Sequence, residues 1–397
     1  MMKDATKTVS AGRDRERFEG AVNPPVYRAS TILSGSLEEL RAKNRTRRGD
    51  GVTYGAHGTP TTFALEEALA ALEGGYRTRL CGTGVTAVAG PLLCYLSAGD
   101  HLLMTDGLYG PTRDFCDGML RRLGVETSYY DPLIGGAIAQ LIRPNTRVIF
   151  MESPSSDAFE MQDVPAIAAA ARAAGCLTMI DNTWGSPLFF KPLAHGVDVS
   201  VQAVTKYVGG HADLLMGAAT TTEAAYPALQ RGWQELGLNT SPDDAYLALR
   251  GLRSVAPRMR QHQEGALALA AWLGAQAEVL EVLHPALPSD PGHALWRRDF
   301  TGAASLFGFV LDPEFASQSR IAAMLDGLKL FGVGYSWGGY QSLLIPTDPH
   351  RGRVASVWPR PGRAAGRAMR IHVGLEDPED LIAELDDGFQ RMRRLEA

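Results

Sequence analysis

A single lysine, Lys206, lies in the stretch AVTKYVGGHAD (203–213), directly after an apolar run and just before two glycines. Moving an ammonium group out of water is costly unless its charge is paired or the pKa of the amine falls. Lys206 is therefore either a structural residue with a satisfied partner or an amine that reacts. The second interpretation requires chemically suited residues elsewhere at the same end of the fold.

Three such features lie upstream of the lysine. The segment GTGVTAVAG (82–90) is a glycine-rich turn entering a helix, where backbone N–H groups and the helix dipole would hold a phosphate. Asp181 closes the apolar run CLTMID, and Tyr109 follows another such run. An anion cradle, an acid for a ring nitrogen, an aromatic face and an amine for an aldehyde are together the groups needed to bind pyridoxal phosphate.

A dinucleotide site is the main alternative at this point. Gly82, Gly84 and Ala87 satisfy GxGxxA, and Asp106 ends the next apolar run, where a ribose-binding acid would lie. However, a long stretch of polar chain and helix precedes the motif, whereas dinucleotide-binding domains usually begin with that strand. A dehydrogenase would also leave Lys206 without a role.

The elements that position these residues alternate along the chain. TTFALEEALAALEGG predicts a helix with Thr61 as N-cap and a Gly-Gly stop. Apolar runs separated by helical segments then predict a mainly parallel sheet covered on both faces, with its ligand beyond the carboxyl ends of the strands. These runs are 101–106, 147–153, 176–181, 197–204 and 214–222.

Three regions are expected along the chain. Residues 1–58 form an N-terminal arm of the kind that serves a neighbouring subunit, and residues 59–253 form a large cofactor-binding domain. Residues 254–397 form a smaller α+β domain, which begins with a long helical segment. The expected fold class is therefore α/β, with a mainly parallel central sheet and a smaller C-terminal domain.

Composition narrows the function further. Hydrophobic residues make up 45% of the 397 residues and charged residues 21%, which is typical of folded globular proteins. The net charge of -5 argues against nucleic acid as a partner. The polar opening and the lack of a long apolar run predict a cytoplasmic protein without a membrane span. The four cysteines are scattered, so neither a disulfide framework nor a metal site is expected.

Several longer segments carry a family resemblance that covers nearly the whole chain. They are YGAHGT, SAGDHLLMTDGLYGPTRDFC, ESPSSDAFEMQDVPAI, IDNTW, QAVTKYVGGHAD, RRDFTGAASLFGFVL, YSWGGYQSL and RIHVGLED. With them the chain resembles the pyridoxal-phosphate enzymes of cysteine and methionine metabolism, most closely the bacterial cystathionine β-lyases. The resemblance implies pyridoxal 5'-phosphate as cofactor and fold type I, the aspartate aminotransferase-like fold.

The resemblance also implies a role for each matching residue. Lys206 binds the cofactor's aldehyde and acts as the catalytic base, and Asp181 binds the pyridine nitrogen. Tyr109 stacks on the ring and takes part in catalysis. The phosphate contacts implied are Gly84, Val85 and Thr205.

Substrate binding and assembly follow from the same resemblance. Arg370 clamps the substrate α-carboxylate, a task suited to a planar fork of donors. Tyr54 reaches into the neighbouring subunit's site, where it contacts the cofactor and acts in catalysis, which implies an obligate dimer paired into a tetramer. The substrate pocket is lined by Tyr335, Ser336 and Trp337.

Three positions depart from the family pattern. Ala56 stands where many relatives carry an arginine that contacts the phosphate across the dimer. His57, a nearby arginine or backbone donors are the alternatives for that contact. Ala203 replaces a frequent phosphate-binding serine, and Gln341 replaces a frequent glutamate.

The implied activity is a carbon–sulfur β-lyase of methionine biosynthesis. It would cleave the thioether L-cystathionine, or a related cysteine S-conjugate, to a thiol such as homocysteine, pyruvate and ammonia. The segment YSWGGY favours this branch by resemblance only. The alternatives are a γ-lyase, a γ-synthase or sulfhydrylase on the same scaffold, and a cofactor-binding regulatory protein without turnover.

Overall fold

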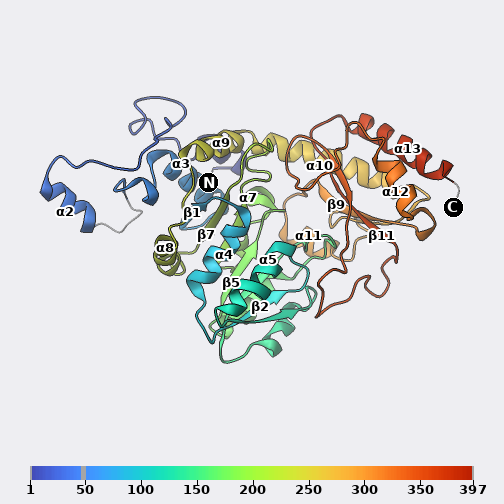
Figure 1. The fold of residues 1–397 in the computed structure, drawn as a ribbon, viewed down its shortest axis with the longest axis horizontal. Helices are drawn as coiled ribbons and strands as arrows, with labels where there is room; N and C mark the ends of the chain where they lie inside the picture. The colour runs from blue at the N-terminus through green and yellow to red at the C-terminus, as the bar shows by residue number, and fades with distance from the viewer. Residues whose placement is uncertain (1, 46–50, 396–397) are drawn as a thin grey trace.

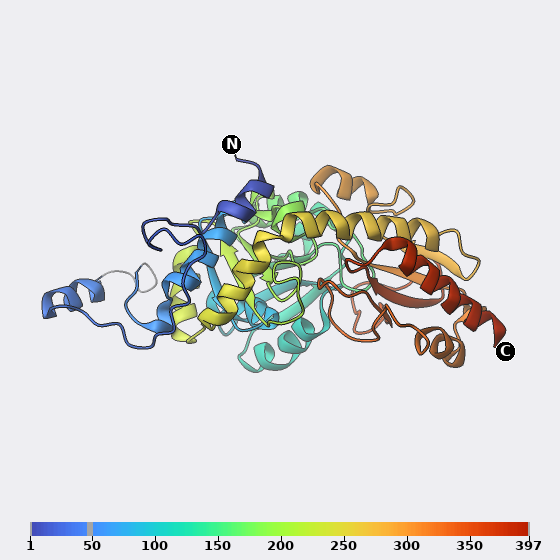
Figure 2. The ribbon, with the colours of Figure 1, turned by 90° about the horizontal axis from the view of Figure 1, so that it is seen from above.

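Two sheets of different size lie side by side along the long axis of the molecule (Figure 1). The structure is a computed structural model and describes residues 2–45 and 51–395. Helix α10 (Val255–Leu273) runs from the larger part of the molecule onto the smaller one (Figure 2). The termini of the chain lie far apart, the C-terminus on the smaller part.

The larger sheet has seven strands in the order β1-β7-β6-β5-β4-β2-β3. The pairs from β3 through β6 are parallel, and β7 is antiparallel to both of its neighbours. This confirms the mainly parallel sheet. The strands are β1 (Arg77–Cys81), β2 (His101–Thr105), β3 (Glu126–Tyr130), β4 (Thr146–Glu152), β5 (Leu177–Asp181), β6 (Val199–Ala203) and β7 (Gly217–Thr221).

Helices cover both faces of this sheet and form a separate core on each. On one face pack α4 (Gly84–Tyr95) and α8 (Tyr226–Glu235), with α5 (Gly110–Phe115) beside α4. The opposite face carries α3 (Pro60–Glu73), α6 (Val164–Ala173), α7 (Ser186–Phe189) and α9 (Pro242–Arg253). Because both faces are buried, the central strands β2, β4 and β5 read as largely apolar runs in the sequence.

The start of α3 differs from expectation by two residues. The N-cap is Thr59, whose side chain accepts a hydrogen bond from the backbone N–H of Thr62, and Pro60 occupies the first helical position. Thr61, the expected cap, instead donates its hydroxyl to the carbonyl of Pro25 at 2.7 Å. The expected stop is correct, since Gly74 takes the left-handed conformation with φ of 72°.

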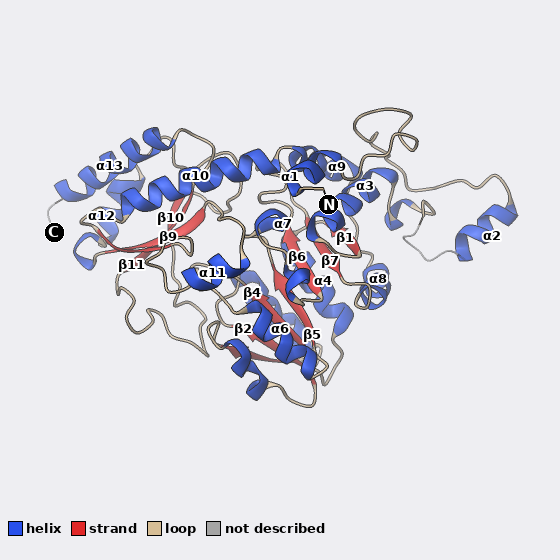
Figure 3. Cartoon of the chain, turned by 180° about the vertical axis from the view of Figure 1, so that it is seen from behind, coloured by secondary structure: helices blue, strands red, loops and turns tan. Residues whose placement is uncertain are grey.

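The smaller sheet is antiparallel, in the order β10-β11-β9-β8. Three of its strands, β9, β10 and β11, are labelled in Figure 3. Its apolar core lies between the sheet and helices α10, α12 and α13. Of the helices in the described ranges, none is long and apolar enough to cross a membrane. The elements here are β8 (Val279–Leu283), α11 (His293–Asp299), β9 (Leu306–Leu311), α12 (Gln318–Leu325), β10 (Leu343–Pro346), β11 (Arg367–His372) and α13 (Pro378–Arg394).

The N-terminal segment has two parts. Helix α1 (Asp4–Ser10) packs against α3, α9 and α10, and Phe18 is buried in the core of the larger part. Beyond it the chain extends away from the body and carries α2 (Leu37–Arg45) at its far end (Figures 1 and 2). Only this later part behaves as an arm, and the boundaries at 58/59 and 253/254 stay predictions.

Candidate active site

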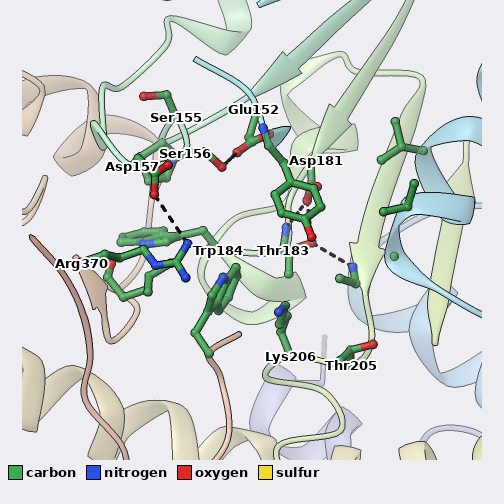
Figure 4. A pocket seen from close by; sticks show the side chains of 18 of the residues that line it. Glu152, Ser155, Ser156, Asp157, Asp181, Thr183, Trp184, Thr205, Lys206 and Arg370 are labelled. Carbon is green, nitrogen blue, oxygen red and sulfur yellow. Dashed lines mark hydrogen bonds and ion pairs between the residues drawn. The ribbon is translucent and has the colours of Figure 1, made fainter. Parts of the chain in front are cut away.

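The ends of several central strands converge on one cavity of about 250 Å³. Asp181 is the last residue of β5, Glu152 is the last residue of β4, and Lys206 lies in the turn after β6. Because these strands are parallel, their carboxyl ends meet at the same edge of the sheet. Arg370 reaches the cavity from β11 of the smaller sheet, so the site is built by both parts of the molecule (Figure 4).

The start of helix α4 provides an anion cradle. Thr83 caps the helix by accepting a hydrogen bond from the N–H of Thr86, which leaves the N–H groups of Gly84 and Val85 without a partner in the helix. These two residues line the cavity, where a helix N-terminus favours a phosphate. A Cβ atom added to Gly84 would lie 2.8 Å from the Cβ atom of Ala203, so only glycine allows this close approach.

Thr205 borders the same end of the cavity, but its hydroxyl is already engaged. The Oγ1 atom accepts a hydrogen bond from the N–H of Met216 at 2.9 Å and donates one to the carbonyl of Met216 at 3.2 Å. The hydroxyl therefore ties the turn that carries Lys206 to the segment leading into β7.

Two neighbouring carboxyl groups lie at the inner end of the cavity. Asp181 accepts hydrogen bonds from the N–H and the Oγ1 hydroxyl of Thr183, at 2.9 and 2.5 Å. Glu152, its partner in the sheet register, accepts from the N–H of Tyr109 at 2.9 Å and from the hydroxyl of Ser156 at 2.5 Å. Burial raises the pKa of both carboxyl groups, and the charge of Asp181 raises that of Glu152 further.

Lys206 is half-buried, and its amine points toward Ser336. Its Nζ atom donates a hydrogen bond to the Ser336 hydroxyl at 2.6 Å and lies 5.1 Å from the ring centroid of Trp337. Burial, and then the nearby charge of Arg370, lower the pKa of Lys206 to about 8, while Asp181 acts in the opposite direction. This environment favours the interpretation of Lys206 as a reacting amine over that of a lysine in a structural ion pair, and the reactive role stays a prediction.

Arg370 forms an ion pair inside the cavity. Its Nη1 atom lies 3.5 Å from Oδ1 of Asp157, a contact drawn at one side of the pocket in Figure 4. Asp157 itself adopts a left-handed backbone conformation with φ of 61°. Asp and Asn tolerate this region better than most residues do.

The structure brings most of the predicted site residues together. Ser336 contacts Lys206, but it belongs with Tyr335 to an adjoining groove. Tyr335 is 90% exposed there, and Tyr54 lies outside the cavity of its own chain, half exposed and edge-on to His57. The predicted residues that line the cavity are Gly84, Val85, Tyr109, Asp181, Thr205, Lys206, Trp337 and Arg370.

Among the cavity residues that were not predicted as site residues are Glu152, Asp157, Thr183 and Trp184. Glu152 could have been predicted from the sequence, because it lies at the end of the apolar run RVIFMES, as Asp181 lies at the end of CLTMID. Trp184 was expected to be a packing residue; its ring is buried, and its indole N–H donates to the carbonyl of Leu306 at 2.8 Å. Asp157 and Thr183 lie in turns, where the sequence carries no periodic signal.

The alternative role for Asp106 is wrong. Its carboxylate is 2% exposed and accepts hydrogen bonds from the N–H groups of Val354, Ala355 and Ser356 and from Arg113 at 2.8 Å. A carboxylate with these partners has no capacity for a ribose hydroxyl. Asp106 instead anchors the loop that follows β10.

The residues present fit pyridoxal phosphate. One cavity contains an amine with a lowered pKa, a buried carboxyl group, an aromatic residue, Tyr109, and the first N–H groups of a helix. The glycine at position 84 lets the start of α4 approach Ala203 closely. Lys206 would bind the aldehyde, Asp181 the ring nitrogen, and Gly84 and Val85 the phosphate.

Comparisons with known proteins agree with this fit. The family model of the Cys/Met metabolism PLP-dependent enzymes matches residues 5–390. The chain is 43% identical to cystathionine beta-lyase MetC of Escherichia coli over 391 residues, 98% of each chain. It is also 43% identical to cystathionine beta-lyase of Salmonella typhimurium over 390 residues, again 98% of each chain.

A solved structure gives the same result for the fold. The crystal structure of cystathionine gamma synthase from Xanthomonas oryzae pv. oryzae superposes with a TM-score of 0.88 at 31% identity, covering 99% of both chains. The expected α/β fold of these enzymes is thereby confirmed. The chain belongs to the pyridoxal-phosphate-dependent enzymes of cysteine and methionine metabolism.

Proposed function

We propose that the chain is a carbon–sulfur β-lyase that cleaves L-cystathionine and related cysteine S-conjugates to a thiol, pyruvate and ammonia. The observation that carries this proposal is that Lys206, Asp181 and Arg370 line one cavity. The greater similarity to the β-lyases than to the γ-synthase favours elimination at Cβ.

The cofactor and Lys206 have different roles in the proposed reaction. Pyridoxal phosphate, when bound, supplies an aldehyde for the substrate amine and a ring that accepts the negative charge developing at Cα. Lys206 then acts as the base that removes the proton from Cα and returns a proton to the departing sulfur. Its lowered pKa suits it to both steps, because an amine with a pKa of about 8 gains and loses a proton near neutral pH.

Asp181 holds a proton at the ring nitrogen. The two hydrogen bonds from Thr183 fix the orientation of the carboxylate and lower its pKa against the effect of burial. A cationic ring nitrogen would lower that pKa further, since an opposite charge favours the ionised carboxyl group. Glu152 then remains the protonated member of the neighbouring pair.

Arg370 orients the substrate through its α-carboxylate. The planar guanidinium can bind the two carboxylate oxygens at once, which fixes the direction of the Cα–H bond. Trp337 supplies apolar surface on a wall of the same cavity, where the thioether would lie, and Tyr109 would stack on the cofactor ring. In this arrangement the Cα proton faces Lys206.

The completed site is proposed to require a second copy of the chain. Tyr54 does not reach the cavity of its own chain, and the extended arm exposes Leu33 and Leu37. A groove of about 860 Å³ lined by Tyr335, Ser336 and other residues adjoins the cavity. We infer that the arm of a neighbouring subunit covers this groove and brings Tyr54 to the cofactor, in a dimer that pairs into a tetramer.

Product analysis tests the assignment. The purified holoenzyme is incubated with L-cystathionine, and the products are separated and quantified. Pyruvate with homocysteine is the expected result, whereas 2-oxobutyrate with cysteine would identify a γ-lyase. Bound cofactor without either product would identify a regulatory protein. The Lys206→Ala variant serves as the control, because any product it forms does not come from this site.

A further inference from the structure

Asp157 is a charged group in the cavity that the proposed reaction does not use. Its Oδ1 atom is buried and accepts no hydrogen bond from any residue within the described ranges. The nearest cation is Arg370, whose Nη1 atom lies 3.5 Å away, beyond a good hydrogen bond. The Oδ1 atom therefore retains its capacity to accept hydrogen bonds beside the arginine proposed to bind the substrate.

The loop that carries Asp157 is held firmly. The N–H of Ser155 donates to the carbonyl of Glu160 at 2.9 Å, and the N–H of Ser156 donates to the carbonyl of Gly107 at 2.8 Å. The carboxylate of Glu160 forms ion pairs with Arg353 and Arg360 at 2.6 and 2.5 Å. Because the loop is fixed at both ends, Asp157 cannot readily turn away when a ligand approaches Arg370.

The three carboxyl groups of the cavity differ in their partners. Asp181 and Glu152 each accept two hydrogen bonds from neighbouring N–H and hydroxyl groups. Asp157 forms an ion pair with Arg370, but its buried Oδ1 atom accepts no hydrogen bond from the described residues. A carboxylate ligand on Arg370 takes up that positive charge and places a second negative charge within a few ångströms of Asp157, which is unfavourable.

An α-amino acid brings its own compensation. Its ammonium group is bonded to the same carbon as its carboxylate, so the zwitterion presents both charges to the Asp157–Arg370 pair. A carboxylate without the amine presents only the negative charge. Repulsion by Asp157 therefore weakens the binding of carboxylates that lack the α-amino group of a substrate.

We propose that Asp157 is a specificity-determining residue that opposes the binding of carboxylates lacking an α-ammonium group. This inference rests on the proposed role of Arg370 as the carboxylate-binding residue. The alternative is that Asp157 positions Arg370. In that role it would orient the guanidinium and strengthen the binding of every carboxylate.

A pair of matched probes separates these roles. S-methyl-L-cysteine and 3-(methylthio)propanoate differ only in the α-amino group. Their dissociation constants are measured by calorimetry on the holoenzyme reduced with borohydride, which keeps the cofactor attached and blocks turnover. The variant is Asp157→Asn, since asparagine retains the size of aspartate and tolerates the left-handed backbone. Asp326→Asn removes the same charge from an exposed site and is the matched control.

The expected result is a change in selectivity. Asp157→Asn should tighten the binding of 3-(methylthio)propanoate about tenfold, the size of effect that a neighbouring like charge has on a titration. The binding of S-methyl-L-cysteine should change less, so the ratio of the two constants falls. Asp326→Asn should leave the ratio as in the parent enzyme, and Arg370→Lys should weaken both ligands.

Two results would overturn the inference: an unchanged ratio in Asp157→Asn, or weaker binding of 3-(methylthio)propanoate, which would make Asp157 a support for Arg370. If Arg370→Lys binds both ligands as the parent does, the premise about Arg370 fails. None of these measurements depends on elimination at Cβ. Failure of the proposed β-lyase activity would therefore show in the product assay alone.

Discussion

The state of Lys206 depends on three opposing influences. Burial and the charge of Arg370 disfavour the ammonium form, whereas the charge of Asp181 favours it. The first two prevail, and the pKa falls to about 8. The hydrogen bond to Ser336 keeps the Nζ atom at a fixed place in the cavity while its charge changes.

This balance predicts how the lysine reacts in the enzyme stripped of cofactor. A lowered pKa means that the neutral, nucleophilic amine predominates above about pH 8 rather than only above the ordinary lysine value of about 10.4. Acylation of Lys206 by acetic anhydride, followed by mass spectrometry of its peptide, should therefore reach half its maximal rate near pH 8.

The Arg370→Gln variant provides the control for this measurement. Removing a neighbouring positive charge should raise the pKa of Lys206, so the midpoint of labelling should move to higher pH. A midpoint at the ordinary lysine value in the parent protein would contradict the buried, charge-opposed environment described for this amine.

At the scale of elements, the sequence predicts the buried strands better than the bordering ones. Apolar runs predicted β2, β4, β5, β6 and β7, but no apolar run predicted β1 or β3. β1 carries two arginines, and β3 is an edge strand with partly exposed side chains. Such strands are defined by the neighbours they pair with, and this pairing is not encoded in local hydrophobicity.

The site residues also divide into those that the local sequence pattern predicts and those that it does not. Residues at the ends of buried strands, Asp181 above all, could be placed by pattern alone, and so could the glycine-rich start of α4. Arg370 lies on a strand of the other sheet and was found only through the family resemblance. The place of Asp157 depends on a turn fixed by long-range ion pairs, and no local pattern predicts that.

The loop after β10 depends on one buried carboxylate. Asp106 accepts hydrogen bonds from three backbone N–H groups and from the guanidinium of Arg113, so Asp106→Ala would remove the ion pair with Arg113 and leave part-buried donors without their acceptor. We expect the free energy of unfolding in urea to fall by about 3 kcal/mol. Asp326→Ala, at an exposed position, should change it by less than about 0.5 kcal/mol. A similar loss in both variants would contradict the anchoring role.

At the scale of the whole molecule, the N-terminal arm is the segment that we propose to act in the site of a neighbouring subunit. Residues 31–45 leave the body of the molecule, and Leu33 is 84% exposed. An exposed apolar segment of this kind is costly in water and is typical of an interaction with another subunit. The groove beside the cavity offers a surface for it in a second copy of the chain.

Mixing two inactive variants tests whether the site is shared. Tyr54→Ala removes the residue that the arm is proposed to deliver, and Lys206→Ala removes the base from the cavity. If Tyr54 acts in the neighbouring subunit's site, a mixed dimer contains one site with both defects and one intact site. Random exchange of equal amounts should then restore about a quarter of the parent activity, because half of the dimers are mixed and half of their sites are intact.

Activity is measured as pyruvate released from L-cystathionine after denaturation and joint refolding. Each variant refolded alone is the control, and a mixture no more active than the separate variants would place Tyr54 within its own chain's site or outside the reaction.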